Sequence, residues 1–229
     1  NYIEGTEFEV DEAKAIVDSG IPMPRRDEDS HDILGTFKVL SNRTEMMKTP
    51  TSPKELFAIL SHRHSILLEG RPHMNPGIFK TKNNRAGMTE FVDYQLVKGT
   101  LSQGFKYYAA LTDTFARAIF MMFMISEVHP FNDGNGRIAR VMMNAELVRA
   151  DQSRIIVPTV FREDYILALR KLTRHKDPLA YINVMTKLHQ FSDNLYGTDF
   201  TELKDYLAAC NAYEEPSQAK LQIIDRTIS

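Results

Sequence analysis

The feature that most restricts the fold of this 229-residue chain is an uninterrupted apolar run at residues 118–125, Ala-Ile-Phe-Met-Met-Phe-Met-Ile. The run is too short to span a bilayer, which takes about 20 residues in a helix. Because it is apolar on every side of a helix, it predicts a central helix that its neighbours cover completely. We expect this helix to begin after Gly104 and to end near Pro130, since proline disfavours helical geometry in the residue before it.

That helix leads directly into a block with the chemistry of a phosphate site, His-Pro-Phe-Asn-Asp-Gly-Asn-Gly-Arg at residues 129–137, and Arg140 follows. An imidazole such as that of a histidine generally titrates near neutrality and can take a proton from a hydroxyl, which makes His129 a candidate base. The carboxylate of Asp133 suits Mg²⁺. Gly-Asn-Gly alone is usually an ordinary turn, but here it can direct backbone N–H groups toward an anion at the start of a predicted helix. Arg137 and Arg140 would share one face of that helix.

The block resembles the signature of the Fic family, His-Pro-Phe-x-Asp/Glu-Gly-Asn-Gly-Arg-x-x-Arg, at every specified position. The resemblance implies an enzyme that moves AMP from ATP to a hydroxyl side chain of a target protein, on an all-α core with a small β-hairpin. It implies that His129 is the base for the attacking hydroxyl, that Asp133 binds Mg²⁺, and that Phe131 is an anchor in the core. The residues implied for the nucleotide phosphates are Gly134, Asn135, Gly136, Arg137 and Arg140, the last of them at the terminal phosphate.

Periodicity and punctuation predict further helices, so we expect an all-α fold. The expected helices are residues 10–19, 32–44, a helix opened by Ser52-Pro53 that runs toward Gly70, and residues 162–172, 178–190 and 200–213. Residues 154–160 resemble a strand instead. The resemblance covers residues 1–190, so we expect a Fic-like core domain there and a C-terminal helical extension at residues 191–229.

The helical pattern fails at residues 76–98, where short strand-like runs at 76–80 and 91–97 flank turn residues at 83–87. In the Fic family this stretch forms a flap whose exposed edge aligns a segment of the target by strand addition, which reads backbone rather than side chains. A plain surface hairpin is the alternative.

Four further side chains are candidates for function. Tyr165 follows the strand-like run, where Fic proteins often place an aromatic residue, so we assign it to the nucleotide base or ribose, with simple packing as an equal alternative. His62, His64 and His73 cluster in sequence, but residues two apart do not face each other on a helix. We therefore expect surface or capping roles for these histidines rather than a metal site.

The resemblance also implies autoinhibition by a segment of the chain itself. Many Fic proteins carry Ser/Thr-x-x-x-Glu-Gly/Asn on an inhibitory helix, whose glutamate pairs with the second arginine of the motif. Ile-Glu-Gly at residues 3–5 matches the end of this pattern, and residues 6–13 resemble the segment that opens the family core just after the inhibitory helix. We therefore prefer Glu4 as the regulatory residue. Residues 65–70 match the whole pattern and make Glu69 the alternative, although a helix that closes on Gly70 would explain them equally well.

Composition limits the partners. A net charge of −2 gives no general affinity for nucleic acid or for an anionic membrane. The single cysteine, Cys210, excludes an intramolecular disulfide and suits a reducing compartment, so we expect a cytoplasmic protein. The expected partner is a target protein with a Ser, Thr or Tyr hydroxyl, including the chain itself, and a homodimer stays open. The alternative functions are removal of AMP, transfer of another nucleotide or phosphate group, and a non-catalytic ATP-binding interaction module.

Overall fold

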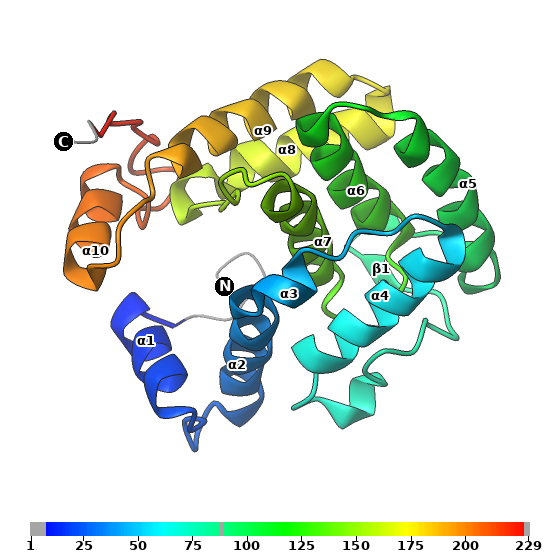
Figure 1. Cartoon of the computed structure of the whole chain (residues 1–229), viewed down its shortest axis with the longest axis horizontal. Helices are drawn as coiled ribbons and strands as arrows, with labels where there is room; N and C mark the ends of the chain where they lie inside the picture. The colour runs from blue at the N-terminus through cyan, green and yellow to red at the C-terminus, as the bar shows by residue number, and fades with distance from the viewer. Residues whose placement is uncertain (1–7, 88, 227–229) are drawn as a thin grey trace. The chain divides into compact units, whose positions relative to one another are not determined.

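The computed structural model of the chain describes residues 8–87 and 89–226 (Figure 1). The regular elements of this described part are helices, apart from one hairpin of two short strands, which confirms the all-α class. The α-helices are α1 Val10–Ser19, α2 Asp27–Ser41, α3 Arg43–Met46, α4 Pro53–Leu67, α5 Val97–Ala110, α6 Thr114–Val128, α7 Asn135–Arg149, α8 Arg162–His175, α9 Pro178–Asp193 and α10 Phe200–Ala209. The strands are β1 Arg85–Ala86 and β2 Thr89–Glu90, and short 3₁₀ turns lie at Pro72–Met74, Tyr94–Leu96 and Thr159–Phe161.

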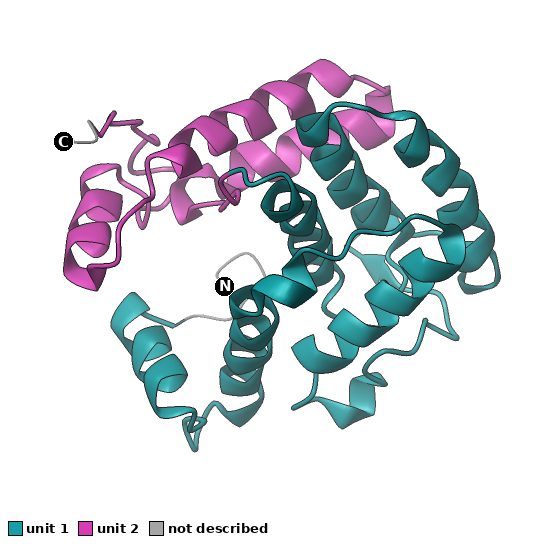
Figure 2. Cartoon of the chain, viewed as in Figure 1, with its two compact units in different colours: residues 1–152 teal, residues 153–229 magenta. Residues whose placement is uncertain are grey.

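The chain divides into two compact units, residues 1–152 and residues 153–229 (Figure 2). The first unit holds the whole phosphate motif, and the second holds Tyr165. This division describes compactness and does not test which residues form the functional core. The expected core at residues 1–190 therefore stays a prediction. Among the described residues, no helix has both the length and the apolar content that a membrane crossing requires.

Two helices of the first unit begin and end on signals that were visible in the sequence. α1 ends at Ser19, and Gly20 caps it in the left-handed conformation, as expected. α4 begins at Pro53, and the hydroxyl of Ser52 accepts a hydrogen bond from the backbone N–H of Glu55 at 3.2 Å. The helix was expected to run toward Gly70, and its last residue is Leu67.

α2 and α3 differ from the single helix expected at residues 32–44. α2 begins five residues earlier, at Asp27, with three acidic residues in its first turn, where the helix dipole favours negative charge. α2 ends at Ser41, and Asn42 caps the separate helix α3 by accepting a hydrogen bond from the N–H of Glu45. Glu45 in turn holds the wholly buried Arg63 of α4 through a 3.1 Å contact with Nε. Burial alone would raise the pKa of Glu45, but hydrogen bonds from Lys48 and Arg63 outweigh it and lower that pKa.

The apolar run forms the buried centre of the first unit, as expected, but its helix begins later. Gly104 lies inside α5, where a β-carbon would come within 2.5 Å of the sulfur of Met124, so this glycine permits close packing rather than starting a helix. α6 begins after Asp113, whose carboxylate accepts a hydrogen bond from the N–H of Ala116 at 2.7 Å. Met121, Met122 and Ile125 are among its fully covered residues. α6 ends at Val128 and packs against α7, so the motif connects two core helices.

The flap contains a hairpin, but β1 lies inside the region read as a turn, and β2 lies between that turn and the expected strand at residues 91–97. β1 pairs antiparallel with β2, with Arg85 opposite Glu90 and Ala86 opposite Thr89. The expected strands at residues 76–80 and 91–97 are absent from the described residues, and Tyr94–Leu96 is a 3₁₀ turn. The carboxylate of Asp93 starts this turn by accepting a hydrogen bond from the N–H of Gln95, which competes with strand geometry.

The second unit consists of α8 and α9, which pack on each other, followed by α10. Helices were expected at all three places, and α8 and α9 each extend three residues further than expected, whereas α10 ends at Ala209 rather than at residue 213. The strand-like run at residues 154–160 is irregular and closes in a 3₁₀ turn, because the described residues offer it no neighbouring strand. Cys210 is a buried thiol.

Candidate active site

The loop between α6 and α7 has the geometry of an anion-binding site. Gly134 has φ 69°, and it is the residue immediately before α7. Asn135 is buried, and its side chain closes the loop by accepting a hydrogen bond from the N–H of Phe131 at 2.9 Å and donating one to the carbonyl of the same residue at 2.8 Å. Phe131 itself is fully buried, which confirms the expected anchor. The N–H groups of the first turn of α7 have no acceptor within the helix by geometry, so they and the helix dipole favour an anion at this end.

His129 occupies the left-handed conformation at the end of α6, with φ 50° and ψ 61°. A left-handed conformation is costly for a residue with a β-carbon and turns the chain sharply out of the helix. Nδ1 of His129 lies 3.1 Å from the carbonyl oxygen of Ser126. Since a carbonyl can only accept, Nδ1 must carry the proton in this contact, and Nε2 of the neutral imidazole then carries the lone pair. The ring therefore has the tautomer that a general base requires at Nε2.

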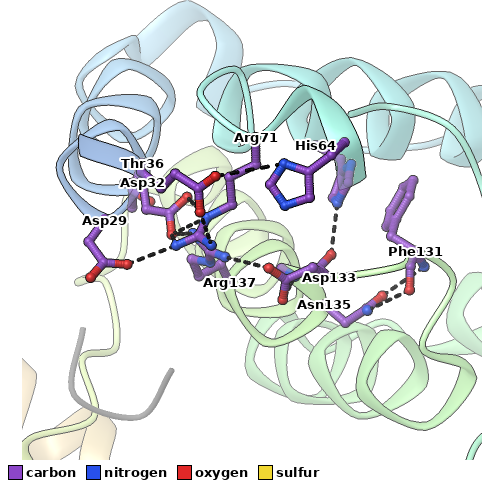
Figure 3. A network of polar contacts seen from close by, with 12 residues as sticks. Asp29, Asp32, Thr36, His64, Arg71, Phe131, Asp133, Asn135 and Arg137 are labelled. Carbon is purple, nitrogen blue, oxygen red and sulfur yellow. Dashed lines mark hydrogen bonds and ion pairs between the residues drawn. The ribbon is translucent and has the colours of Figure 1, made fainter. Parts of the chain in front are cut away.

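Arg137 lies in the first turn of α7 between two carboxylates (Figure 3). Its side chain is 4% exposed, with Nη1 2.6 Å from Oδ2 of Asp32 on α2 and Nη2 3.6 Å from Oδ2 of Asp133. The 2.6 Å contact is an ion pair with poor alignment, because within the described residues neither Nε nor Nη1 of Arg137 has an acceptor in hydrogen-bonding geometry. Buried guanidinium N–H groups without aligned acceptors are rare and costly. A phosphate oxygen would supply the missing acceptor.

The carboxylate of Asp32 is shared by two arginines (Figure 3). Its side chain is 2% exposed and also accepts from Nε of Arg71 at 3.1 Å through each oxygen. Arg71 further contacts Asp29 at 2.8 Å and Glu28 at 3.0 Å. Burial would lower the pKa of Arg71, but the charge and hydrogen bonds of Asp32 outweigh it and raise that pKa. α2 thus supplies the carboxylate that compensates the buried charge of Arg137.

His64 is the main site residue that the sequence reasoning missed. The expected surface or capping role is wrong, since the residue is fully buried and its ring stacks on that of Phe131 with centroids 3.7 Å apart. The N–H of Gly77 donates to Nδ1 at 2.9 Å, so Nε2 carries the proton and donates to the carbonyl of Asp133 at 2.9 Å. Burial, aided by the positive charge of Arg137, lowers the pKa of His64 to about 4 against the opposing hydrogen bond to Asp133. A neutral imidazole therefore joins α4, the first part of the flap at residues 77–84, which we call the flap stem, and the motif loop.

The flap stem contacts the backbone on both sides of His129. The N–H of Lys80 donates to the carbonyl of Pro130 at 2.8 Å, and its Nζ lies 3.4 Å from the carbonyl of Val128. Asn84 accepts from the same Nζ at 2.7 Å and donates to the carbonyl of Phe131 at 2.9 Å. Lys80 is buried, and that burial lowers its pKa. These hydrogen bonds connect the flap directly to the residues that flank His129.

Asp133 is the expected metal ligand. Its Oδ1 accepts from the N–H of Gly134 at 2.7 Å, and its side chain is 37% exposed. Among the described residues, no three His, Cys, Asp or Glu side chains gather as a metal cluster. This donor set fits Mg²⁺, which is commonly held by one or two carboxylates while substrate phosphates and water supply the remaining oxygens.

The remaining expected site residues lie in several parts of the chain. Gly136 and Arg140 lie on α7, with Arg140 half-buried. Tyr165 is buried in the second unit. Glu4 lies outside the described residues. Glu69 is 67% exposed, and its carboxylate lies 3.2 Å from Nζ of Lys38.

Comparison with known proteins identifies the motif region. The sequence model of the Fic/DOC family matches residues 52–147, which include α4, the flap, α6 and the complete motif. This part of the chain is therefore similar to the Fic/DOC family. Of the residues that compensate the charge of Arg137, Asp133 lies inside the matched Fic region and Asp32 lies outside it.

Curated proteins that resemble this chain are named as protein adenylyltransferases. A "Protein adenylyltransferase Fic" of Nematostella vectensis is 26% identical over 211 residues, which are 86% of this chain and 47% of the relative. A "Protein adenylyltransferase fic-1" of Caenorhabditis elegans is 24% identical over 73% of this chain and 34% of its own length. A probable protein adenylyltransferase of Aquifex aeolicus is 32% identical over 45% of this chain and 30% of its own length. The chain thus spans less than half the length of each of these relatives.

Solved Fic structures share the fold. Fic-1 of C. elegans (residues 134–508) matches with a TM-score of 0.69 and 19% identity, over 92% of this chain and 61% of that one. A Fic domain containing signaling protein of Bacteroides thetaiotaomicron matches with a TM-score of 0.70 and 17% identity, over 82% of this chain and 79% of that one. The chain therefore shares its overall helical fold with these proteins.

Proposed function

We propose that the chain is a Mg²⁺-dependent protein adenylyltransferase, which transfers AMP from ATP to a Ser, Thr or Tyr hydroxyl of a target protein. The observation that carries the proposal is the convergence, in one loop, of a base-oriented His129, the N-terminus of α7 and the buried Arg137. The names of the curated relatives support the same activity.

The proposed reaction needs no covalent intermediate on the protein. Nε2 of His129 takes the proton of the target hydroxyl while that oxygen attacks the α-phosphorus of ATP. The bond between this phosphorus and the oxygen bridging to the β-phosphate breaks, and pyrophosphate leaves with the electron pair. Phosphoryl-type transfer depends mainly on positioning and on stabilising the charge of the phosphate oxygens. Arg137, Arg140 and the backbone N–H groups of residues 134–136 would provide that stabilisation.

Asp133 would hold Mg²⁺ on the nucleotide phosphates. The bound ion would supply charge neutralisation and orientation of the phosphates. The contribution of the chain is to keep the carboxylate at the mouth of the loop, through the hydrogen bond from Gly134 and the contact of His64 with the Asp133 carbonyl.

Recognition of the two substrates would fall to different parts of the chain. The hairpin strands β1 and β2 would align a target segment by strand addition. Tyr165 would contact the nucleotide base or ribose. A cytoplasmic location agrees with the thiol state of Cys210.

Autoinhibition is part of the proposal. Glu4 would pair with Arg140 in the absence of target and deprive the terminal phosphate of its partner, since carboxylate and phosphate use the same donors of arginine. Glu4→Gly should then increase self-modification sharply, whereas Glu69→Gly should leave it unchanged, because the Glu69 carboxylate is exposed and pairs with Lys38. Activation by the Glu69 change alone would transfer the role to that residue.

The function is tested by incubating the chain with α-labelled ATP, Mg²⁺ and a lysate, followed by mass spectrometry of labelled proteins. We expect labelled hydroxyl side chains with the parent chain and none with His129→Ala, which should bind ATP with nearly unchanged affinity because base catalysis acts in the transition state. Asp133→Ala should remove the dependence on Mg²⁺ together with the activity. ATP binding without transfer to any protein would instead indicate a non-catalytic module.

A further inference from the structure

The flap contacts the catalytic base itself, in addition to any contact with a target. The ring of Phe91, the residue after β2, stacks face to face on the imidazole of His129, with centroids 3.5 Å apart and planes inclined by 3°. Aromatic pairs prefer offset or edge-on arrangements unless the surrounding structure imposes parallel planes. The contacts that hold the backbone of Phe91 and His129 must therefore impose the parallel planes.

Phe91 is attached to the motif through the flap stem. Its N–H donates to the carbonyl of Asn84 at 3.3 Å, one step beyond the strand pairing. The side chain of Asn84 donates to the carbonyl of Phe131, two residues after His129. Lys80 contacts the carbonyls of Val128 and Pro130, on either side of His129. The hydrogen bonds of Asn84 and Lys80 thus connect Phe91 to the backbone around His129.

The stack and the hydrogen bond of His129 restrict different rotations. A half-turn of the ring about Cβ–Cγ would preserve the stack but exchange Nδ1 with a carbon and lose the contact with Ser126. A smaller tilt would strain the hydrogen bond only slightly but would separate the ring planes. The stacking on Phe91 thus fixes the plane of the imidazole, and the hydrogen bond to Ser126 fixes which edge carries Nδ1. Together they fix the direction of the Nε2 lone pair.

We propose that Phe91 is a positioning residue, which holds the imidazole of His129 in the plane in which Nε2 takes the proton of the target hydroxyl. The inference rests on the proposed function for its kinetic consequence, but its geometric content is independent of it. A base contributes only when it is aligned with the proton that it removes, and a small misplacement can cost up to about a hundredfold in rate. The flap would thus organise the base as well as the target.

The test compares Phe91→Leu, which keeps an apolar side chain without a flat face, with Phe91→Tyr, which keeps the ring. The geometry is measured by NMR of the full chain with carbon-labelled histidine, in which His129→Gln identifies the His129 signals. In the parent, the ring of Phe91 should displace the imidazole C–H resonances upfield. The displacement should disappear in Phe91→Leu and persist in Phe91→Tyr.

The kinetic measurement is the first-order rate constant for self-modification at saturating ATP, together with the ATP concentration that gives half of it. We expect Phe91→Leu to lower the rate constant by about tenfold or more, with the half-saturating ATP concentration unchanged, and Phe91→Tyr to stay within about threefold of the parent. Histidine resonances unchanged by Phe91→Leu would overturn the inference. An undiminished rate constant would overturn it equally. A parent that transfers nothing yet shows the displaced resonances would refute the proposed function and leave the stacking role established by NMR.

Discussion

Replacing Asp32 by alanine should destabilise the first unit, although this residue lies far from the motif in sequence. Its carboxylate is 2% exposed and lies 2.6 Å from Nη1 of Arg137 and 2.9 Å from Nη2 of Arg71. Removing one partner from a buried ion pair costs about 3 to 5 kcal/mol, mainly because the remaining charge stays buried without compensation. Arg71 would keep Asp29 and Glu28, whereas Arg137 would keep the longer 3.6 Å contact with Asp133. We therefore expect a loss near the lower limit, about 3 kcal/mol in the free energy of unfolding.

Urea denaturation followed by far-ultraviolet circular dichroism measures this loss. With a slope of about 2 kcal/mol per molar urea, the midpoint should fall by about 1.5 M. Asp29→Ala is the matched control, because Asp29 also contacts Arg71 but is 35% exposed, and exposed ion pairs contribute about 1 kcal/mol or less. Saturating ATP should reduce the deficit of Asp32→Ala, since a bound phosphate restores negative charge beside Arg137. Equal midpoints for the two variants would refute the view that Asp32 compensates both arginines.

Three further changes test other parts of the site. Gly134→Ala should weaken ATP binding, measured by calorimetry, severalfold. An alanine in the left-handed conformation costs about 1 kcal/mol or more, and its β-carbon would lie 3.3 Å from the Leu68 side chain. Unchanged ATP affinity would contradict the loop geometry. His64→Phe keeps an aromatic ring but leaves the N–H of Gly77 and the carbonyl of Asp133 without their partner. Thermal unfolding should therefore show a loss of about 2 kcal/mol or more in the free energy of unfolding. Unchanged stability would show that His64 does not join these two segments. Because the pKa of Glu45 is lowered, its contact with Arg63 stabilises the protein above the unfolded pKa near 4.5, and this stability is lost as the pH falls below that value. The difference in the free energy of unfolding between the parent and Glu45→Gln should therefore shrink in acid. A difference that does not change with pH would refute this prediction.

The sequence predicted the parts of the structure that depend on neighbouring residues. The cap at Ser52, the end of α1 at Gly20 and the buried apolar run each follow from local chemistry, and each was found in the structure. The loop between α6 and α7 was predicted in the same way, since His129, Asp133, the glycines and the arginines lie within twelve consecutive residues. Its role in binding phosphate stays a prediction. Local signals were also overlooked: Asp113 is an ordinary N-cap that could have separated α5 from α6.

The contacts that hold the loop could not be read in this way, because their partners are far apart along the chain. Asp32 meets Arg71 across 39 positions, and His64 meets Asp133 across 69 positions. A spacing rule on one helix could assign His64 to a face but could not show that this face lies under the motif. The packing of α2 and α4 around α7 decides both contacts, and periodicity in a single sequence does not specify how helices pack.

The position of Asp32 also bears on where this domain can be cut. A fragment trimmed to the family match at residues 52–147 would contain every residue of the motif but would lose α2. Arg71 would then lose its contacts with Glu28, Asp29 and Asp32, and Arg137 would keep the 3.6 Å contact with Asp133. Such a fragment would carry the complete signature but would lack the ion pairs that join α2 to Arg71 and Arg137. A fragment that keeps these buried charges compensated must therefore begin upstream of α2 rather than at the edge of the matched region.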